Sequence, residues 1–383
     1  DILSLIGRMD TAEPVIYAAS SAIKKLDETS LPADSNALLN LDILARANSN
    51  ILVANSQNLS EIVGLNEGIP SPPTLPAGAR DASWSPSGRY CAVGNTSSTG
   101  SIKIYKVEGS AFTEVESFDH GAQVISLSWH PTGNFLAASG AVGTGSKSLH
   151  VFSFENENLT EVASHASGNN LYGCHWNYDG TWLATGELST GNVYVYSFNS
   201  ITKILGAPVT AATHGVGLWM VKWSFDGKHI LAAGHDAGAG VSNTRIRLYS
   251  FNSTAVTLTE ITACRSDLGD TGSGYVTDCT WGVWDDNYFA LASYDNNFAS
   301  LKTFYFDGST ITQKDSILFD ADLYGVSVSN DKKTLYCGGR STNDQARIYK
   351  IEADGKLTFL NKKSDFNDFL SGAVLVRQAQ CWL

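Results

Sequence analysis

The sequence is poor in charge and in sulfur, and it has no long apolar segment. No run of about 20 apolar residues occurs, so we expect no membrane span. Residues Asp1 to Gly7 lack the basic region of a secretory signal. Charged residues make up only 17% of the chain and the net charge is −12, which argues against a nucleic-acid groove, because such a groove neutralises phosphates with Lys and Arg. We therefore expect a soluble protein without a nucleic-acid partner.

Local motifs of catalysis and metal binding are missing as well. The 6 cysteines form no Cys-x-x-Cys pair and show no His-plus-Cys spacing of a zinc site. The sequence contains no His-Glu-x-x-His, no Gly-x-Ser-x-Gly and no phosphate-binding loop. These absences predict no metal, no cofactor, no catalytic residues and no enzymatic activity.

What the chain has in abundance is a repeated turn that begins with an anchor residue. Six anchors are separated by 45, 47, 47, 58 and 47 residues, a period typical of four-stranded propeller blades. The copies are Trp84-Ser85-Pro86-Ser87-Gly88, Trp129-His130-Pro131-Thr132-Gly133, Trp176-Asn177-Tyr178-Asp179-Gly180, Trp223-Ser224-Phe225-Asp226-Gly227, Trp281-Gly282-Val283-Trp284-Asp285 and Val328-Ser329-Asn330-Asp331-Lys332.

Each repeat also contains an alternating apolar strand that ends on an aromatic ring. The six rings are Tyr105, Phe152, Tyr196, Tyr249, Phe304 and Tyr349. Apolar residues at period two indicate strands, and each repeat has room for four short strands between its turns. A single four-stranded blade cannot bury both faces, so the blades are expected to pack radially around a channel.

This pattern resembles the WD-repeat propeller family from about Ala79 to the C-terminus, although the Trp-Asp pair of that family is absent and Tyr or Phe replaces its Trp. The resemblance implies an all-β fold, a β-propeller of four-stranded antiparallel blades, with seven blades favoured and six as the alternative. His120, His165 and His214 match the family's Gly-His position and are expected to be structural.

Cysteines at equivalent positions of different blades are too far apart to be bridged, which favours buried thiols and synthesis in a reducing cytoplasm.

The first 78 residues have a different character. Residues 1–66 predict a helical anchor, residues 67–78 a Pro-rich linker and residues 79–383 the propeller. A heptad stripe with Asn at core positions predicts a coiled coil and hence self-association. Its residues are Leu41, Leu44, Asn48, Ile51, Asn55, Asn58, Ile62 and Leu65.

The N-terminal region has a second interpretation. Residues 51–63 also resemble the outer strands of the second repeat, and Leu370 to Val376 begin a seventh repeat, so N-terminal strands could instead close the ring. A helical anchor, a Pro-rich joint and an all-β head are also similar to phage virion appendages such as head or tail fibres. That resemblance implies a location on a virion.

Loop lengths locate the candidate binding residues. The fourth repeat carries two insertions, and both are expected on one face of the ring. The candidate contacts are His235, Asp236, Arg265, Asp267, Asp270 and Tyr275. The sequence therefore predicts a non-enzymatic protein that displays rim loops to protein partners or to a host-surface glycan or receptor. The alternatives are a propeller-type hydrolase or lactonase, and a glycan-binding lectin.

Overall fold

The computed structural model describes residues 78–363, apart from 100, 109–110, 211–213, 215–216, 235–244, 267–274, 295–299, 320–321, 330 and 340–345. All of these belong to the second of the two units into which the chain divides, residues 70–383. The predicted helical anchor, its heptad stripe and the linker lie outside the described residues, so the domain boundaries at residues 66 and 78 stay predictions.

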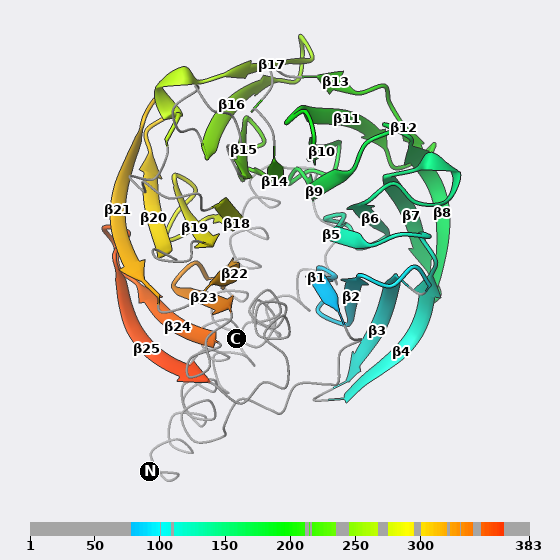
Figure 1. The fold of residues 1–383 in the computed structure, drawn as a ribbon, viewed down its shortest axis with the longest axis horizontal. Coiled ribbons are helices and arrows are strands. Elements are labelled where there is room, and N and C mark those ends of the chain that lie inside the picture. The colour runs from blue at the N-terminus through cyan, green and yellow to red at the C-terminus, as the bar shows by residue number, and fades with distance from the viewer. Residues whose placement is uncertain are drawn as a thin grey trace, which may run out of the picture. The chain divides into compact units, whose positions relative to one another are not determined.

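The described chain forms six antiparallel sheets arranged around a central channel (Figure 1). The first two sheets consist of β1 (Ala79–Trp84), β2 (Tyr90–Asn95), β3 (Ile102–Glu108) and β4 (Ala111–Phe118), and of β5 (Val124–Trp129), β6 (Phe135–Gly140), β7 (Leu149–Glu155) and β8 (Asn158–His165). The third and fourth sheets consist of β9 (Leu171–Trp176), β10 (Trp182–Glu187), β11 (Val193–Asn199), β12 (Ile204–Leu205) and β13 (Val209–Thr210), and of β14 (Leu218–Trp223), β15 (His229–Gly234), β16 (Ile246–Asn252) and β17 (Thr257–Glu260). The fifth and sixth sheets consist of β18 (Tyr275–Trp281), β19 (Tyr288–Tyr294), β20 (Ser300–Phe306) and β21 (Ile311–Leu318), and of β22 (Leu323–Val328), β23 (Thr334–Gly339), β24 (Ala346–Ile351) and β25 (Leu357–Lys363).

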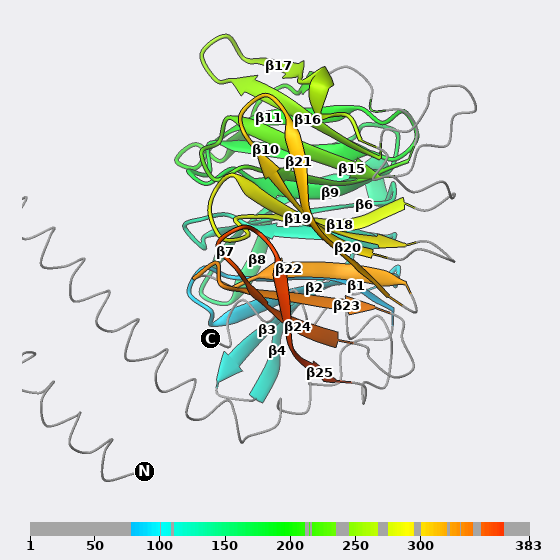
Figure 2. The ribbon, with the colours of Figure 1, turned by 90° about the vertical axis from the view of Figure 1, so that its left-hand side faces the viewer.

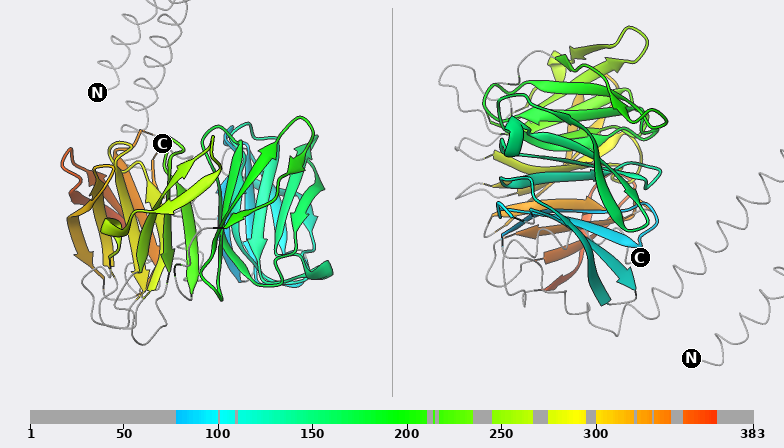
Figure 3. Two further views of the ribbon diagram at one scale, coloured as in Figure 1. Left: turned by 90° about the horizontal axis from the view of Figure 1, so that it is seen from above. Right: turned by 90° about the vertical axis from the view of Figure 1, so that its right-hand side faces the viewer.

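The order of strands within each sheet confirms the predicted blade. The first strand of each repeat lies at the channel, and the following strands pair outward in chain order; in the third sheet β12 and β13 both pair with β11. The strands run between the two ends of the ring, where the connections lie (Figures 2 and 3). Two short 3-10 helices, η1 (Thr144–Ser146) and η2 (Thr262–Cys264), are the only helices among the described residues.

The core of the ring lies between neighbouring sheets. Five hydrophobic clusters each join two consecutive sheets, from the first and second to the fifth and sixth. Five of the six aromatic rings of the third strands are buried in these clusters, and Phe152, Tyr196 and Tyr249 have no exposed surface. The strands were predicted to end on these rings, but each continues two or three residues beyond its ring. The alternation in the sequence is therefore explained by burial of both faces of each sheet.

The repeated turns are the second element that orders the ring. The indole Nε1 of Trp176 donates to the carbonyl oxygen of Ser128 at 3.0 Å, and that of Trp129 donates to the carbonyl of Ser83 at 3.0 Å. Trp281 makes the same bond to the carbonyl of Lys222 at 3.2 Å, so three anchors bond to the residue just before the anchor of the preceding sheet, whereas Nε1 of Trp223 has no partner among the described residues. Gly133 in the second turn has φ 78°, a left-handed conformation that glycine adopts without strain.

The described residues contain six blades, and a seventh is not among them. Five cysteines are described; all five are buried, and none forms a disulfide with another described residue.

Candidate functional site

The inner strands bond to one another around the channel through polar side chains. Asp81 Oδ2 accepts the backbone N–H of Leu127 at 2.8 Å, and Asp278 Oδ2 accepts that of Val326 at 3.0 Å. Both carboxylates are at least 97% buried, with exposed fractions of 3% and 1%. They satisfy the free backbone edge of the next inner strand. We therefore regard these two aspartates as structural rather than catalytic.

Every inner strand carries a β-bulge near its start, four residues before the anchor position in five sheets and three residues before it in β9. One residue of each inner strand is skipped in the pairing with the second strand. Bulges re-aim side chains and are over-represented next to active sites. The skipped residues are Arg80, Ile125, Gly173, Trp219, Thr277 and Tyr324.

These bulges all lie at one end of the channel, which we call the upper mouth. It is the end at which the outer strand of one sheet connects to the inner strand of the next. The opposite end, where the anchor turns connect the first and second strands, is the lower mouth. Six bulges in phase can present side chains from several blades to one small molecule at the upper mouth.

Tyr172 is at the centre of the polar and aromatic contacts of the upper mouth. Gln123 Nε2 donates to the Tyr172 hydroxyl at 3.4 Å, and the ring of Trp219 lies edge-on at 5.4 Å between centroids. Burial raises the pKa of Tyr172, while the charge of Arg80 acts in the opposite direction. The Tyr172 side chain is therefore contacted by Gln123 and Trp219 and influenced by the charge of Arg80, residues that come from separate parts of the ring.

Arg80 is exposed and has no ion-pair partner within the described part of the chain. An unpaired guanidinium beside a phenol, an amide and an indole suits a small molecule that carries negative charge or develops it during reaction.

The sixth sheet contributes a second group to the upper mouth. The hydroxyl of Tyr324 donates to Asp322 Oδ2 at 3.4 Å, and the Tyr324 ring lies 6.2 Å from that of Tyr294. Asp322 and Tyr324 are both half-buried. Of the two, the carboxylate of Asp322 is the group that can accept a proton.

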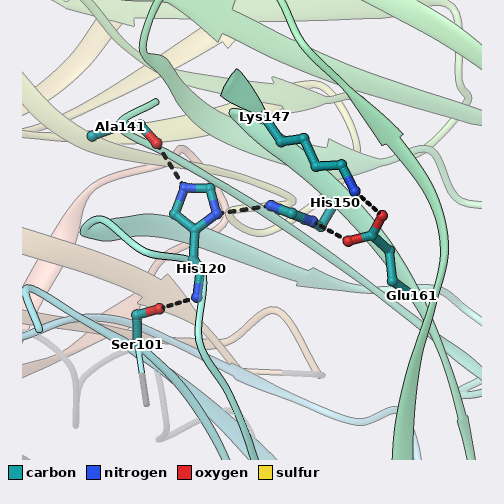
Figure 4. Close-up of polar contacts among 6 residues, drawn as sticks. All are labelled: Ser101, His120, Ala141, Lys147, His150 and Glu161. Carbon is teal, nitrogen blue, oxygen red and sulfur yellow. Dashed lines mark hydrogen bonds and ion pairs between the residues drawn. The ribbon is translucent and has the colours of Figure 1, made fainter. Parts of the chain in front are cut away.

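A buried histidine pair lies between the first and second sheets (Figure 4). His120 Nδ1 is 2.7 Å from His150 Nε2, and His150 Nδ1 is 2.8 Å from Glu161 Oε2, a carboxylate that also pairs with Lys147. His120 Nε2 lies 2.6 Å from the carbonyl oxygen of Ala141. Burial lowers the pKa of His120 and lowers that of His150 to about 4.

The exposed fractions of His120 and His150 are 1% and 3%, so a substrate cannot reach them. The predicted structural role of His120 is thus confirmed. His214 is also buried, whereas His165 is half-buried at the end of β8.

The residues predicted from loop insertions are not brought together by the described structure. Arg265 is exposed and forms a two-pronged ion pair with Glu260, at 2.6 Å and 2.8 Å. Tyr275 begins β18, where its backbone pairs with Tyr294. His235, Asp236, Asp267 and Asp270 lie outside the described residues, as do all eight residues of the heptad stripe. Both sets stay predictions.

The sequence contained a signal for the upper mouth that loop lengths did not reveal. Tyr172, Trp219 and Tyr324 each stand four residues before an anchor, and Arg80 has the same position in the first repeat. Alternation alone assigns such residues to a strand, and the β-bulges beside them become visible only once the partner strand is known.

The described residues contain neither a cluster of metal ligands nor a membrane-spanning helix. In the part of the chain that the structure describes, no group of three or more His, Cys, Asp or Glu residues is placed to hold a metal ion. Within the same residues we find no helix with the length and apolarity that a membrane crossing requires.

Comparison with known proteins identifies the repeat. The sequence model of the WD40 repeat (WD domain, G-beta repeat) matches residues 112–153 and 156–197, which span β4 to β11. No curated protein matches the sequence. The fold and these matches define the chain as a β-propeller with WD40 repeats, six blades of which are described.

Several solved propellers share this fold. A protein from Lactobacillus plantarum has a TM-score of 0.62 and 15% identity, covering 74% of this chain and 84% of that one. The periplasmic gluconolactonase of Pseudomonas aeruginosa has a TM-score of 0.61 and 13% identity, with 74% and 85% covered. A Bacteroides fragilis protein assigned as a 6-phosphogluconolactonase has a TM-score of 0.60 and 16% identity, with 74% and 83% covered. At these identities the similarity establishes the fold alone.

These comparisons correct two predictions. The sequence predicted a non-enzymatic display protein, with a phage virion appendage as one form, and no enzymatic activity. Both predictions are wrong, because propellers of this fold include proteins named as lactonases. The predictions rested on the absence of local catalytic motifs, but a propeller assembles a site from side chains of several blades. The resemblance to phage appendages and the virion location receive no support from the comparisons.

Proposed function

We propose that this protein is a propeller-type hydrolase that opens a sugar lactone at the upper mouth. The observation that carries the proposal is a row of residues at the upper mouth, each four positions before an anchor: Arg80, Tyr172, Trp219 and Tyr324. Three of them are bulge residues, and Tyr172 directly precedes the bulge residue Gly173. The shared fold of the lactonase propellers supports the same reaction class. Aromatic walls with a few polar groups are typical of sites for small ligands.

Lactone hydrolysis makes modest demands on such a site. Water adds to the ring carbonyl, a negative charge develops on the carbonyl oxygen, and the ring C–O bond then breaks as the ring oxygen takes a proton. Arg80 would stabilise the developing oxyanion or an anionic group of the substrate. Asp322, which accepts a hydrogen bond from Tyr324, would take the proton of the attacking water. Trp219 would contact the sugar ring, and Tyr172, which is only 6% exposed, would hold Trp219 in place through their edge-on ring contact.

The test is hydrolysis by the full-length protein. We expect 6-phosphogluconolactone or glucono-1,5-lactone to be opened faster than its spontaneous rate, measured as acid release at constant pH. Arg80→Ala should lower kcat/KM at least tenfold, because Arg80 is exposed and contributes to the site rather than to the core.

Arg89→Ala is the matched control, since Arg89 is an exposed arginine of the same sheet but lies at the anchor turn, near the lower mouth. Hydrolysis no faster than the spontaneous rate for both lactones, or equal activity of the Arg80→Ala variant, would contradict the proposal.

Protein partners remain a second proposal, supported by the WD40 repeats and by the heptad stripe. We infer self-association through residues 41–65. The mass of the intact assembly, compared with that of a chain beginning at Gly78, tests it, and a monomer in both cases would rule it out. Solubility and synthesis in a reducing cytoplasm also stay proposals, consistent with the unpaired thiols of the described cysteines.

A further inference from the structure

The lower mouth carries aromatic rings on three consecutive anchor turns. The rings of Tyr178 and Trp284 are exposed, and that of Phe225 is half-buried against the core. The third residue of the turn is Pro86, Pro131, Tyr178 and Phe225 in the first four sheets, and the fifth turn presents Trp284. Tyr178 is 71% exposed and Trp284 is 37% exposed. We call Tyr178, Phe225 and Trp284 the aromatic arc.

The aromatic arc is continuous across three sheets. The rings of Tyr178 and Phe225 lie 6.2 Å apart, and Lys332 Nζ lies 4.5 Å from the centroid of Phe225. The backbone N–H of Trp284 donates to the carbonyl of Lys332 at 3.1 Å. Gly282 leaves space for Phe225, because a Cβ there would lie 2.4 Å from the phenyl ring. Neighbouring turns therefore fix the positions of these rings.

Trp284 combines exposure with backbone strain. Its φ is 74°, a left-handed conformation that is a genuine outlier for a bulky residue. Strained residues persist only where the surrounding structure holds them, and they cluster at binding sites. The strain at Trp284 is thus an observation, independent of the ring pattern, that points to a ligand.

A carboxylate directly follows each ring of the aromatic arc. In each case Oδ1 of the carboxylate accepts a hydrogen bond from a backbone N–H of the same turn. The donor–acceptor distance is 2.8 Å for Asp179, 3.0 Å for Asp226 and 2.8 Å for Asp285. These bonds fix each carboxylate beside its ring. Each of these three turns therefore presents one aromatic ring and one carboxylate acceptor at the lower mouth.

We infer that the aromatic arc binds a neutral oligosaccharide. Sugar rings have an apolar C–H face that packs on Tyr, Phe or Trp, and hydroxyl groups that donate to carboxylates. A protein partner fits less well, because carboxylates are depleted in the cores of protein interfaces, where they lose their hydration. This binding site lies at the opposite end of the channel from the proposed lactonase site and does not depend on it.

The test uses the full-length protein and a panel of neutral hexasaccharides, including cellohexaose, maltohexaose and chitohexaose, with calorimetry and Trp fluorescence as readouts. We expect at least one member to bind. Trp284→Gly removes the ring and the backbone strain together, so affinity should fall at least tenfold while the melting temperature does not fall. Asp285→Asn should weaken binding and leave the ring in place.

Phe359→Ala is the matched control, because Phe359 is an aromatic residue that is 51% exposed on the outer strand β25, away from the aromatic arc. Its affinity should equal that of the unaltered protein, and Trp284→Gly should leave lactone hydrolysis unchanged. The inference is overturned if no member of the panel binds, if Trp284→Gly binds as the unaltered protein does, or if Phe359→Ala loses affinity equally.

Discussion

At the scale of single residues, the indole nitrogens of the anchor tryptophans show how the ring is bonded. Trp176 Nε1 is bonded to Ser128 of the preceding sheet, whereas the buried Nε1 of Trp84 has no partner among the described residues. A hydrogen-bonded buried donor contributes to stability, and an unsatisfied one reduces it. Trp176 and Trp84 occupy the same repeat position, but the indole N–H contributes to the stability of the fold only in Trp176.

Phenylalanine substitutions separate these roles. Trp176→Phe should lower the free energy of unfolding by about 1–3 kcal/mol, because the Ser128 carbonyl is left without its donor and the core loses ring volume. Trp84→Phe should cost clearly less, since it removes a donor that has no acceptor. Urea unfolding of both variants measures the difference. Equal losses would show that ring volume alone determines the effect.

At the scale of elements, the sequence predicted the strands well and the direction of their side chains poorly. The period-two patterns that contain Phe152 and Tyr249 identified the third strands, although each strand continues three residues beyond the ring at which it was predicted to end. The bulges were not predictable in the same way, because an extra residue does not disturb alternation until the partner strand is known. Arg80 and Trp219 could thus be assigned to strands but not to the channel.

The histidine pair connects elements whose proximity was also hidden in the sequence. His120 precedes β5, His150 lies in β7 and Glu161 in β8, so the contact needs the folded second sheet. The predicted match to the Gly-His position placed His120 correctly, but nothing in the spacing identified His150 as its partner. Lys147, on the connection before β7, completes the charged groups that face this pair.

Stability should depend on pH through His150. Burial lowers its pKa in the folded protein to about 4, below the value of about 6.5 for an unfolded chain. As pH falls from 6.5 to 4, the unfolded chain binds a proton that the folded protein does not. The free energy of unfolding should therefore fall over this range, by about 3 kcal/mol for this residue.

Unfolding by urea at pH 7 and pH 4.5 measures this dependence. His150→Gln should reduce the pH dependence relative to the unaltered protein, whatever its effect on stability at pH 7. A variant with the full pH dependence would show that other groups cause it, such as the half-buried His175, whose pKa is lowered by desolvation.

At the scale of the whole molecule, the two proposed functions lie at opposite mouths of the channel, lactone hydrolysis at the upper mouth and oligosaccharide binding at the lower mouth. The upper mouth combines an unpaired arginine with phenols and a carboxylate, and the lower mouth presents rings on rigid turns. Both arrangements gather residues of several blades, from the starts of the inner strands at the upper mouth and from the anchor turns at the lower mouth. Motifs local in sequence cannot show either site, which explains why their absence misled the functional prediction.

Closure of the ring is the remaining property of the whole molecule, and the first sheet shows where it must occur. One hydrophobic cluster consists of first-sheet residues alone, and within it Cys91 and Val93 have no exposed surface. Every other cluster is shared by two sheets. The unpartnered Trp84 indole belongs to the same face. This face therefore requires a cover that the six described sheets do not provide.

We expect residues 364–383, which include the beginning of a seventh repeat, to contribute that cover. Deleting them should raise the rate at which Cys91 reacts with a thiol reagent by at least tenfold and lower the melting temperature. Cys174, which is buried between the second and third sheets, should stay protected and serves as the internal control. Labelling followed by peptide mass analysis reads both sites in one sample. If Cys91 stays as protected as Cys174 after the deletion, another part of the chain covers the first sheet, and N-terminal strands become the segment to remove next.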